Sequence, residues 1–194
     1  MEAEIREILD NYYELTEQEE ASAFKKIREY AETQPEQFKT LLQSVDRRAY
    51  GFLIDALFEN TNKWSSLFFD EIKRIFETAD KSDDPNNAIL FIDEYSFMDY
   101  DDFTHAEALV DYLKQYLKHR LPAFRFWAVS LIADFIEPTD RLRISILEQL
   151  QKDPDWRIRY WVYQYLTELR GKGRYKLSFM DKLKAKLMNP DKFD

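Results

Sequence analysis

Residues 153–169 read DPDWRIRYWVYQYLTEL, and they predict a sharp turn followed by an amphipathic helix. Pro154 suits the first helical turn, where its missing N–H has no partner to lose. Asp153 is placed to cap the free amides, and Asp155 adds negative charge at the positive end of the helix. Apolar residues then recur at three- and four-residue spacing, which places them on one face: Ile158, Trp161, Val162, Tyr165, Leu166 and Leu169.

A second copy of this pattern lies 34 residues upstream. The corresponding face there is formed by Phe124, Trp127, Ala128, Leu131, Ile132 and Phe135. The helices that precede the two copies also match at this shift. Residues 105–138 and 139–172 are therefore predicted to be two copies of a helix–turn–helix unit. A self-similar period in this range is typical of helical solenoids.

The turn before the second helix resembles that of the HEAT-repeat family, in which Asp is commonly followed six residues later by Arg. Asp153 and Arg159 have this spacing, and Arg125 is present in the upstream copy, where His119 replaces the Asp. In that family the two side chains link neighbouring turns. The resemblance therefore implies structural roles for Asp153, Arg159 and Arg125, and it implies a HEAT-like solenoid fold.

The remaining sequence continues the helical pattern. Thr16 and Glu19 have the spacing of a capping box, and Asp46 precedes another apolar stripe. We expect an all-α, right-handed superhelix of about five helix pairs forming one domain over 1–194, with the helix of residues 175–188 as a cap. The cap is expected to turn its apolar side chains inward and its lysines to solvent.

Composition narrows the function. The chain has no cysteine, which excludes disulfides and thiolate chemistry. It has no apolar run of about 18 residues and no signal-peptide pattern at its start, so we expect a cytoplasmic protein that does not act at a membrane.

The charge is unevenly distributed. Residues 1–111 carry 11 basic and 27 acidic residues, net −16, whereas residues 112–194 carry 17 and 10, net +7. An acidic chain argues against a dedicated nucleic-acid binder, which usually presents a basic face. The split can orient the protein on a partner or on its own copies, or it can reflect two solvated faces.

Candidate chemistry is sparse. Residues 80–111 are rich in Asp and Glu, but the loop from Asp99 has Thr104 where a calcium-binding hand needs Gly, so helix capping and solvation explain the acids better than a metal site. His105 and His119 lie at opposite ends of one predicted helix, about 21 Å apart, too far to share a metal. We expect no cofactor and no catalytic residues.

The most promising surface is a second stripe on the two inner helices, because large aromatics with polar tips are favoured where partners dock. It comprises Trp156, Tyr160, Tyr163, Gln164 and Thr167, and the upstream equivalents are Phe126, Val129, Ser130 and Ala133. The alternative is that these side chains pack between neighbouring repeats. We expect a non-catalytic scaffold that binds a protein or peptide on its concave helix face.

Two other functions stay open. The chain also resembles the DNA alkylation-repair glycosylases built from HEAT-like repeats. Their basic, aromatic concave surface would here draw on Trp127, Trp156, Trp161, Arg125 and Arg159. A self-assembling structural protein is the third reading, with acidic and basic halves meeting head to tail.

Overall fold

The computed structural model describes residues 1–95, 103–135, 141–171 and 173–190 of the chain. Across these ranges the regular structure is entirely helical, and no β-strand occurs in them. The prediction of an all-α protein is therefore confirmed for the described residues. None of the helices within these ranges is both long and apolar enough to cross a membrane.

The α-helices alternate with short 3-10 helices, labelled η. In chain order they are α1 (Glu2–Asn11), η1 (Tyr12–Glu14), α2 (Glu17–Thr33), α3 (Pro35–Leu42), α4 (Arg47–Asp55), η2 (Phe58–Asn60), α5 (Thr61–Asp80), α6 (Pro85–Ala88), η3 (Ile89–Tyr95), α7 (Ala106–Leu113), η4 (Lys114–Lys118), α8 (Pro122–Phe135), α9 (Arg141–Leu150), α10 (Trp156–Arg170) and α11 (Phe179–Leu187).

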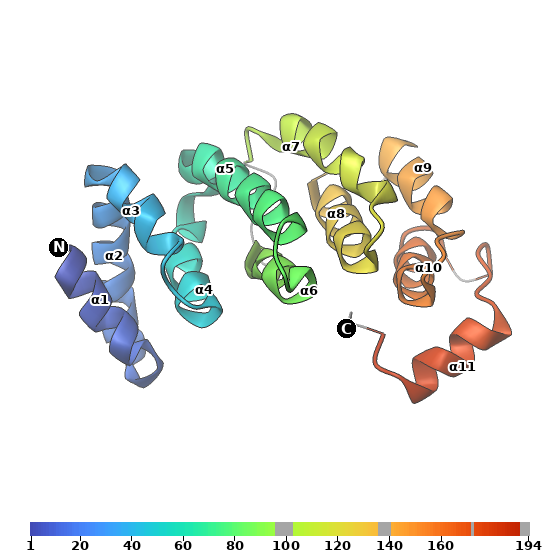
Figure 1. Ribbon diagram of the computed structural model, residues 1–194, viewed down its shortest axis with the longest axis horizontal. Helices are drawn as coiled ribbons and strands as arrows, with labels where there is room; N and C mark the ends of the chain where they lie inside the picture. The colour runs from blue at the N-terminus through green and yellow to red at the C-terminus, as the bar shows by residue number, and fades with distance from the viewer. Residues whose placement is uncertain (96–102, 136–140, 172, 191–194) are drawn as a thin grey trace.

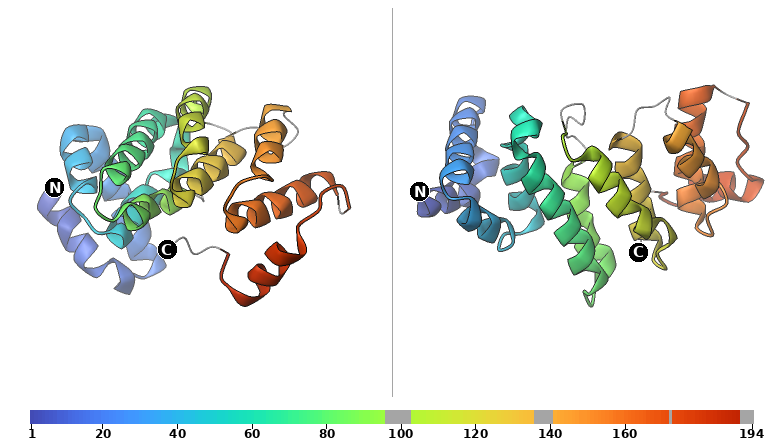
Figure 2. Two further views of the ribbon diagram at one scale, coloured as in Figure 1. Left: turned by 45° about the vertical axis from the view of Figure 1, so that its right-hand side comes forward. Right: turned by 90° about the horizontal axis from the view of Figure 1, so that it is seen from above.

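The helices succeed one another along the long axis of the molecule, with α1 and α11 at opposite ends (Figures 1 and 2). Several consecutive helices pack against each other, as in α1 with α2, α7 with α8 and α9 with α10. A second set of contacts runs between the later members of these pairs, from α4 to η3, then to α8, α10 and α11. These helices form a continuous row, and the candidate binding surfaces lie along it.

Local capping signals were predicted correctly at two helix starts. The Thr16 amide donates to Glu19 at 2.9 Å while the Thr16 hydroxyl accepts from the Glu19 amide, which completes the capping box of α2. The Asp46 carboxylate accepts from the Ala49 amide at 3.0 Å and begins α4. Each contact satisfies an amide that the helix itself leaves without a partner.

Two helix boundaries differ from expectation. The apolar run over residues 88–98 predicts one helix. In the structure Ala88 ends α6, the 3-10 helix η3 continues from Ile89, and residues from 96 onward lie outside the described ranges. The helix predicted from Pro154 begins instead at Trp156, with Asp155 as its N-cap. The Asp153 carboxylate accepts the Asp155 amide within the turn and also contacts another helix.

That carboxylate is held by Arg125 of α8. The Nε and Nη2 atoms of Arg125 donate to the two Asp153 oxygens, both at 2.8 Å, and both side chains are buried. The remaining Nη1 donates to the backbone carbonyls of His119 and Arg120, at 2.7 and 3.2 Å. Arg125 thus joins the turn before its own helix to the turn before the next one.

The same arrangement recurs one unit later. Arg159 donates to both Asp181 oxygens, at 2.9 and 2.6 Å, and its Nη1 donates to the carbonyls of Asp153 and Pro154. Upstream, His119 occupies the place of the turn Asp and its Nε2 lies 2.9 Å from Asp80 Oδ1. We name the two arginine contacts, Arg125 to Asp153 and Arg159 to Asp181, the arginine relay.

The expectation for the terminal helix was wrong. The inner face of α11 presents Asp181, whereas Phe179, Met180, Leu183 and Leu187 are exposed. The reason is the relay itself, because the Asp181 carboxylate must point at Arg159 of α10. The side chains on the opposite side of α11 are then directed to solvent.

We predict that Asp153→Asn destabilises the protein by about 3–5 kcal/mol, because it leaves the buried Arg125 guanidinium without a counter-charge. The asparagine keeps an acceptor for the Asp155 amide, which donates to Asp153 at 2.8 Å. Urea denaturation followed by circular dichroism measures the change.

The matched control for this substitution is Asp111→Asn. Asp111 pairs with Lys114 at 2.7 Å on the exposed surface, so its loss is expected to cost under about 1 kcal/mol. Equal effects of the two substitutions would show that the relay does not hold the helices together.

Candidate binding surface

Helix α10 buries only a narrow stripe. Asp155 caps it by accepting the Arg157 amide at 2.9 Å, and the residues that are buried in it are Ile158, Val162 and Leu166. These follow at four-residue spacing on a single face. The rest of the helix surface is therefore partly or fully open.

The opposite face of α10 carries the aromatic surface, which we define as Trp156, Tyr160, Tyr163 and Gln164. The three aromatic side chains are half-buried and Gln164 is exposed. The Gln164 side-chain amide donates to the Tyr160 hydroxyl at 3.0 Å, which orders the two polar tips relative to each other. All four were expected at a binding surface, and the structure places them together on one side of one helix.

Phe126, which was expected at the same surface, is in the core. Its exposed fraction is 9%, and its ring packs edge-on against Trp127 and Trp161 at centroid distances of 5.1 and 5.7 Å. The cause is the position of α8, which has α7, η4, α9, α10 and η3 around it, whereas α10 lies nearer the end of the row. Of the upstream candidates only Ser130 remains partly exposed.

The open face of α8 is turned relative to expectation. Trp127, Ser130 and Asp134 are half-buried at three- and four-residue spacing, as are Pro122 and Phe135 at the helix ends, whereas Trp127 was expected to point inward. Trp161 of α10 is likewise half-buried and stacks on Tyr165 at 4.9 Å. Both indoles therefore pack on the core with one side and meet solvent with the other.

A polar cluster closes the junction of α8, α9 and α10. The Arg143 guanidinium is buried, donates to the Tyr165 hydroxyl, and lies 4.8 Å from the centre of the Tyr165 ring. Burial raises the pKa of Asp134 to about 6, although the positive charge of Arg143 and a hydrogen bond with Tyr165 act in the opposite direction. Asp134 is therefore a carboxyl group that gains or loses its proton near neutral pH.

A second site, which the sequence analysis missed, lies where η1, α4 and η3 meet. A cavity of about 540 Å³ is lined there by Tyr12, Arg47, Arg48, Gly51, Phe52, Asp55 and Glu94. We call it the N-terminal pocket. Partial burial and the nearby carboxylates of Glu94 and Glu20 raise the pKa of Asp55 to about 6, so acidic groups crowd one side of the pocket.

Gly51 shapes this pocket. A Cβ at position 51 would lie 2.4 Å from the Glu94 carboxylate, which therefore rests directly on the α4 backbone. Arg47 holds that carboxylate through its Nε at 2.7 Å and also donates to Asp93 at 2.6 Å. A glycine inside a helix is unfavourable by about 1 kcal/mol, so its presence there suggests that another group packs closely on the backbone. The lone glycine in the apolar stripe of α4 is therefore the sequence signal that could have revealed the site.

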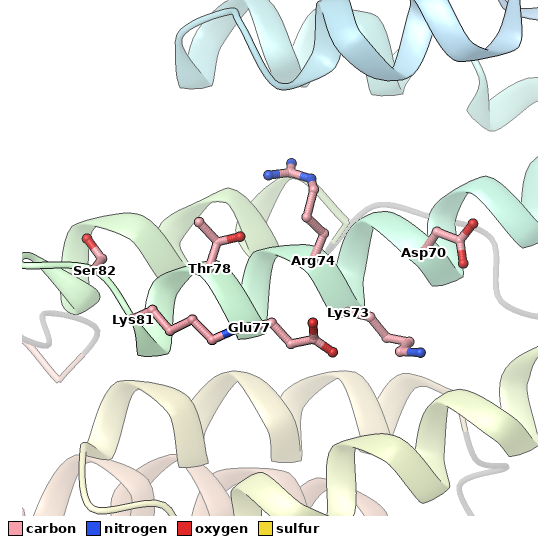
Figure 3. Close-up of a pocket in the computed structure, with 7 residues that line it drawn as sticks. All are labelled: Asp70, Lys73, Arg74, Glu77, Thr78, Lys81 and Ser82. Carbon is pink, nitrogen blue, oxygen red and sulfur yellow. The ribbon is translucent and has the colours of Figure 1, made fainter.

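A second cavity, of about 520 Å³, runs along α5. It is lined by Asp70, Lys73, Arg74, Glu77, Thr78, Lys81 and Ser82, all from α5 and the turn after it (Figure 3). Arg74 is paired with the buried Glu71 at 2.7 Å, and the Lys73 ammonium lies over the Tyr112 ring at 5.3 Å. Side chains of both signs line this groove, so it favours no particular ligand charge.

The two histidines lie in separate settings. The His105 Nδ1 is 2.8 Å from the hydroxyl of the buried Ser65, which also accepts the His105 amide, whereas His119 pairs with Asp80. No group of three or more His, Cys, Asp or Glu side chains within the described ranges is placed to hold a metal ion. Asp99, Asp101 and Asp102 of the acidic stretch lie outside those ranges.

Comparison of the chain with protein-family models, curated proteins and solved structures found no match.

We predict a pH-dependent contribution of Asp134 to stability. Because its pKa is raised in the folded state, the native protein retains a proton that the unfolded chain releases near pH 3.8, and stability falls as the pH rises to about 6. Asp134→Asn removes this loss. The free energy of unfolding of the variant relative to wild type should therefore increase by about 2 kcal/mol between pH 4 and pH 7. A difference independent of pH would contradict the assignment.

We also predict that Gly51→Ala changes stability by different amounts in two backgrounds. Alone, the new methyl group displaces the Glu94 carboxylate from Arg47, which offsets the gain in helix propensity. In a Glu94→Ala background nothing is displaced, and the full gain of about 1 kcal/mol should appear in chemical denaturation. Equal gains in both backgrounds would show that Glu94 does not rest on Gly51.

Proposed function

We propose that the chain is a non-catalytic HEAT-like scaffold that binds a protein or peptide along the row formed by α4, η3, α8 and α10. In this proposal the helix pairs form one right-handed superhelix, with that row on its concave side and α11 at its end. The arginine relay supports the proposal, because the same contact repeats at a spacing of one unit, from Arg125 to Arg159. Repeats that contact only their neighbours build such superhelices.

The observation that carries the binding role is the aromatic surface of α10. Trp156, Tyr160 and Tyr163 lie on a helix whose opposite side is fixed in the core. The helix therefore cannot rotate to bury these three side chains. Tyrosine and tryptophan supply large contact areas at low entropy cost and dominate the energetics of many interfaces. The hydrogen-bonded Tyr160 and Gln164 add polar groups suited to a peptide backbone.

The arginine contacts favour a protein ligand over a nucleic acid. The residues that would supply positive charge in a glycosylase-like groove are Arg125 and Arg159, and both guanidiniums are neutralised by carboxylates. Phosphate binding needs basic groups that are free to replace counterions. The basic side chains nearest the aromatic residues are thus already used within the fold.

We predict that Trp156→Ala combined with Tyr160→Ala weakens the partner complex by at least about tenfold, as expected for interface anchors. The partner would first be identified by a photo-crosslinking residue at position 163, and its affinity then measured by calorimetry. Far-ultraviolet circular dichroism should show unchanged helicity, because neither side chain is in the buried stripe.

The control is Tyr13→Ala, which removes an aromatic side chain that is 72% exposed but lies on η1, far along the chain from α10. It should leave the affinity unchanged. Equal affinity of the double variant and wild type would reject the aromatic surface as the binding site.

A further inference from the structure

Helix α11 presents an apolar stripe with nothing packed on it among the described residues. The stripe consists of Phe179, Met180, Leu183, Leu187 and Met188, with exposed fractions of 76% at both Phe179 and Leu187. The spacing of Phe179, Met180, Leu183 and Leu187 places them on one side of the helix, and Met188 follows as its C-cap. A contiguous exposed apolar patch of this kind marks a site of interaction.

The stripe cannot turn inward while the relay is intact. Asp181, on the opposite side of α11, is buried and accepts both hydrogen bonds from Arg159, and Ser178 caps the helix by accepting the Asp181 amide at 3.0 Å. These contacts fix the rotation of α11 on α10. The apolar stripe is therefore a permanent surface of the monomer.

The surroundings of the stripe define the chemistry of its partner. Lys182 and Lys186 border it on one side and Lys184 on the other, and residues 170–190 contain seven basic residues against the single acidic Asp181. Asp181 is itself neutralised by Arg159. A fitting partner therefore offers an apolar floor bordered by carboxylates.

Such a surface exists at the other end of the same chain. In the N-terminal pocket the rings of Tyr12 and Phe52 lie 4.9 Å apart and form an aromatic floor. Arg47, Arg48, Asp55 and Glu94 line the pocket, and Arg47 pairs with Glu94 at 2.7 Å. The excess negative charge therefore lies at Asp55, on which the carboxylates of Glu94 and Glu20 also act. Residues 1–60 carry 14 acidic and 7 basic residues, so the charge around the pocket is opposite to that around α11.

We propose that α11 of one copy docks in the N-terminal pocket of a second copy, so that the protein associates head to tail. The apolar stripe would cover Tyr12 and Phe52, while the bordering lysines would approach Asp55 on the side where the charge of Glu20 adds to its own. Because α11 and α1 lie at opposite ends of the long axis (Figure 1), the contact joins two copies. This proposal does not depend on the aromatic surface of α10, and either can fail alone.

A head-to-tail contact uses two different surfaces, and this property provides the test. A copy with a damaged stripe keeps a working pocket, and a copy with a damaged pocket keeps a working stripe. The stripe variant is Phe179→Ser with Leu187→Ser, two exposed positions. The pocket variant is Asp55→Lys, also exposed, where the existing carboxylates already disfavour the negative charge.

Sedimentation velocity over a concentration series at low salt should show wild type growing beyond a dimer, with less growth at high salt because the lysine–carboxylate contacts are screened. Each variant alone should remain a monomer. An equimolar mixture of the two should form a dimer and stop there, since only one intact stripe and one intact pocket can meet. Asp111→Lys, which makes the same charge change on α7, should associate as wild type does.

Three results would overturn the proposal. Wild type that stays monomeric up to several hundred micromolar would exclude self-association through these surfaces. Association of the pocket variant alone at wild-type strength would assign the stripe to a symmetric contact between two α11 helices. A monomer that floats with vesicles containing anionic lipid, and loses this in the stripe variant, would assign the stripe to a membrane surface.

Discussion

The bidentate contact between Arg125 and Asp153 is the interaction on which the C-terminal half of the molecule depends. Each partner is almost fully buried, so neither charge is tolerable without the other. The guanidinium also donates to two carbonyls of its own turn, and these contacts fix its position. The same kind of arginine contact positions three elements. Arg125 positions α8 and the turn before α10, and Arg159 positions α11.

This placement decides which side chains are left for binding. Because Arg159 draws Asp181 inward, the apolar side of α11 is turned outward, and because α10 has few neighbours, its aromatic side is open. At the other end, Gly51 allows Glu94 to rest on α4 and to crowd Asp55. The two ends of the molecule consequently differ in charge as well as in shape, and each end has its own chemistry.

Features determined by neighbours in sequence could be predicted, and features determined by contacts between distant segments could not. The caps at Thr16 and Asp46 depend on residues three positions away, so spacing alone identified them. The burial of Phe126 depends on helices that surround α8, and the side of α11 that faces inward depends on a partner 22 residues upstream. The contact of the Glu94 carboxylate with the backbone at Gly51 joins residues 43 positions apart, so no local sequence pattern predicts it.

The relay also discriminates between correct and incorrect stacking. The Arg125 guanidinium donates four hydrogen bonds, two to carbonyls of its own turn and two to the carboxylate of the next, and all four require one alignment of the helices. If α10 slid along α8 by a single helical turn, a buried cation and a buried anion would both lose their partners. The contact therefore selects one alignment of the helices. The apolar side chains around it are interchangeable, and by themselves they would also accept shifted packings.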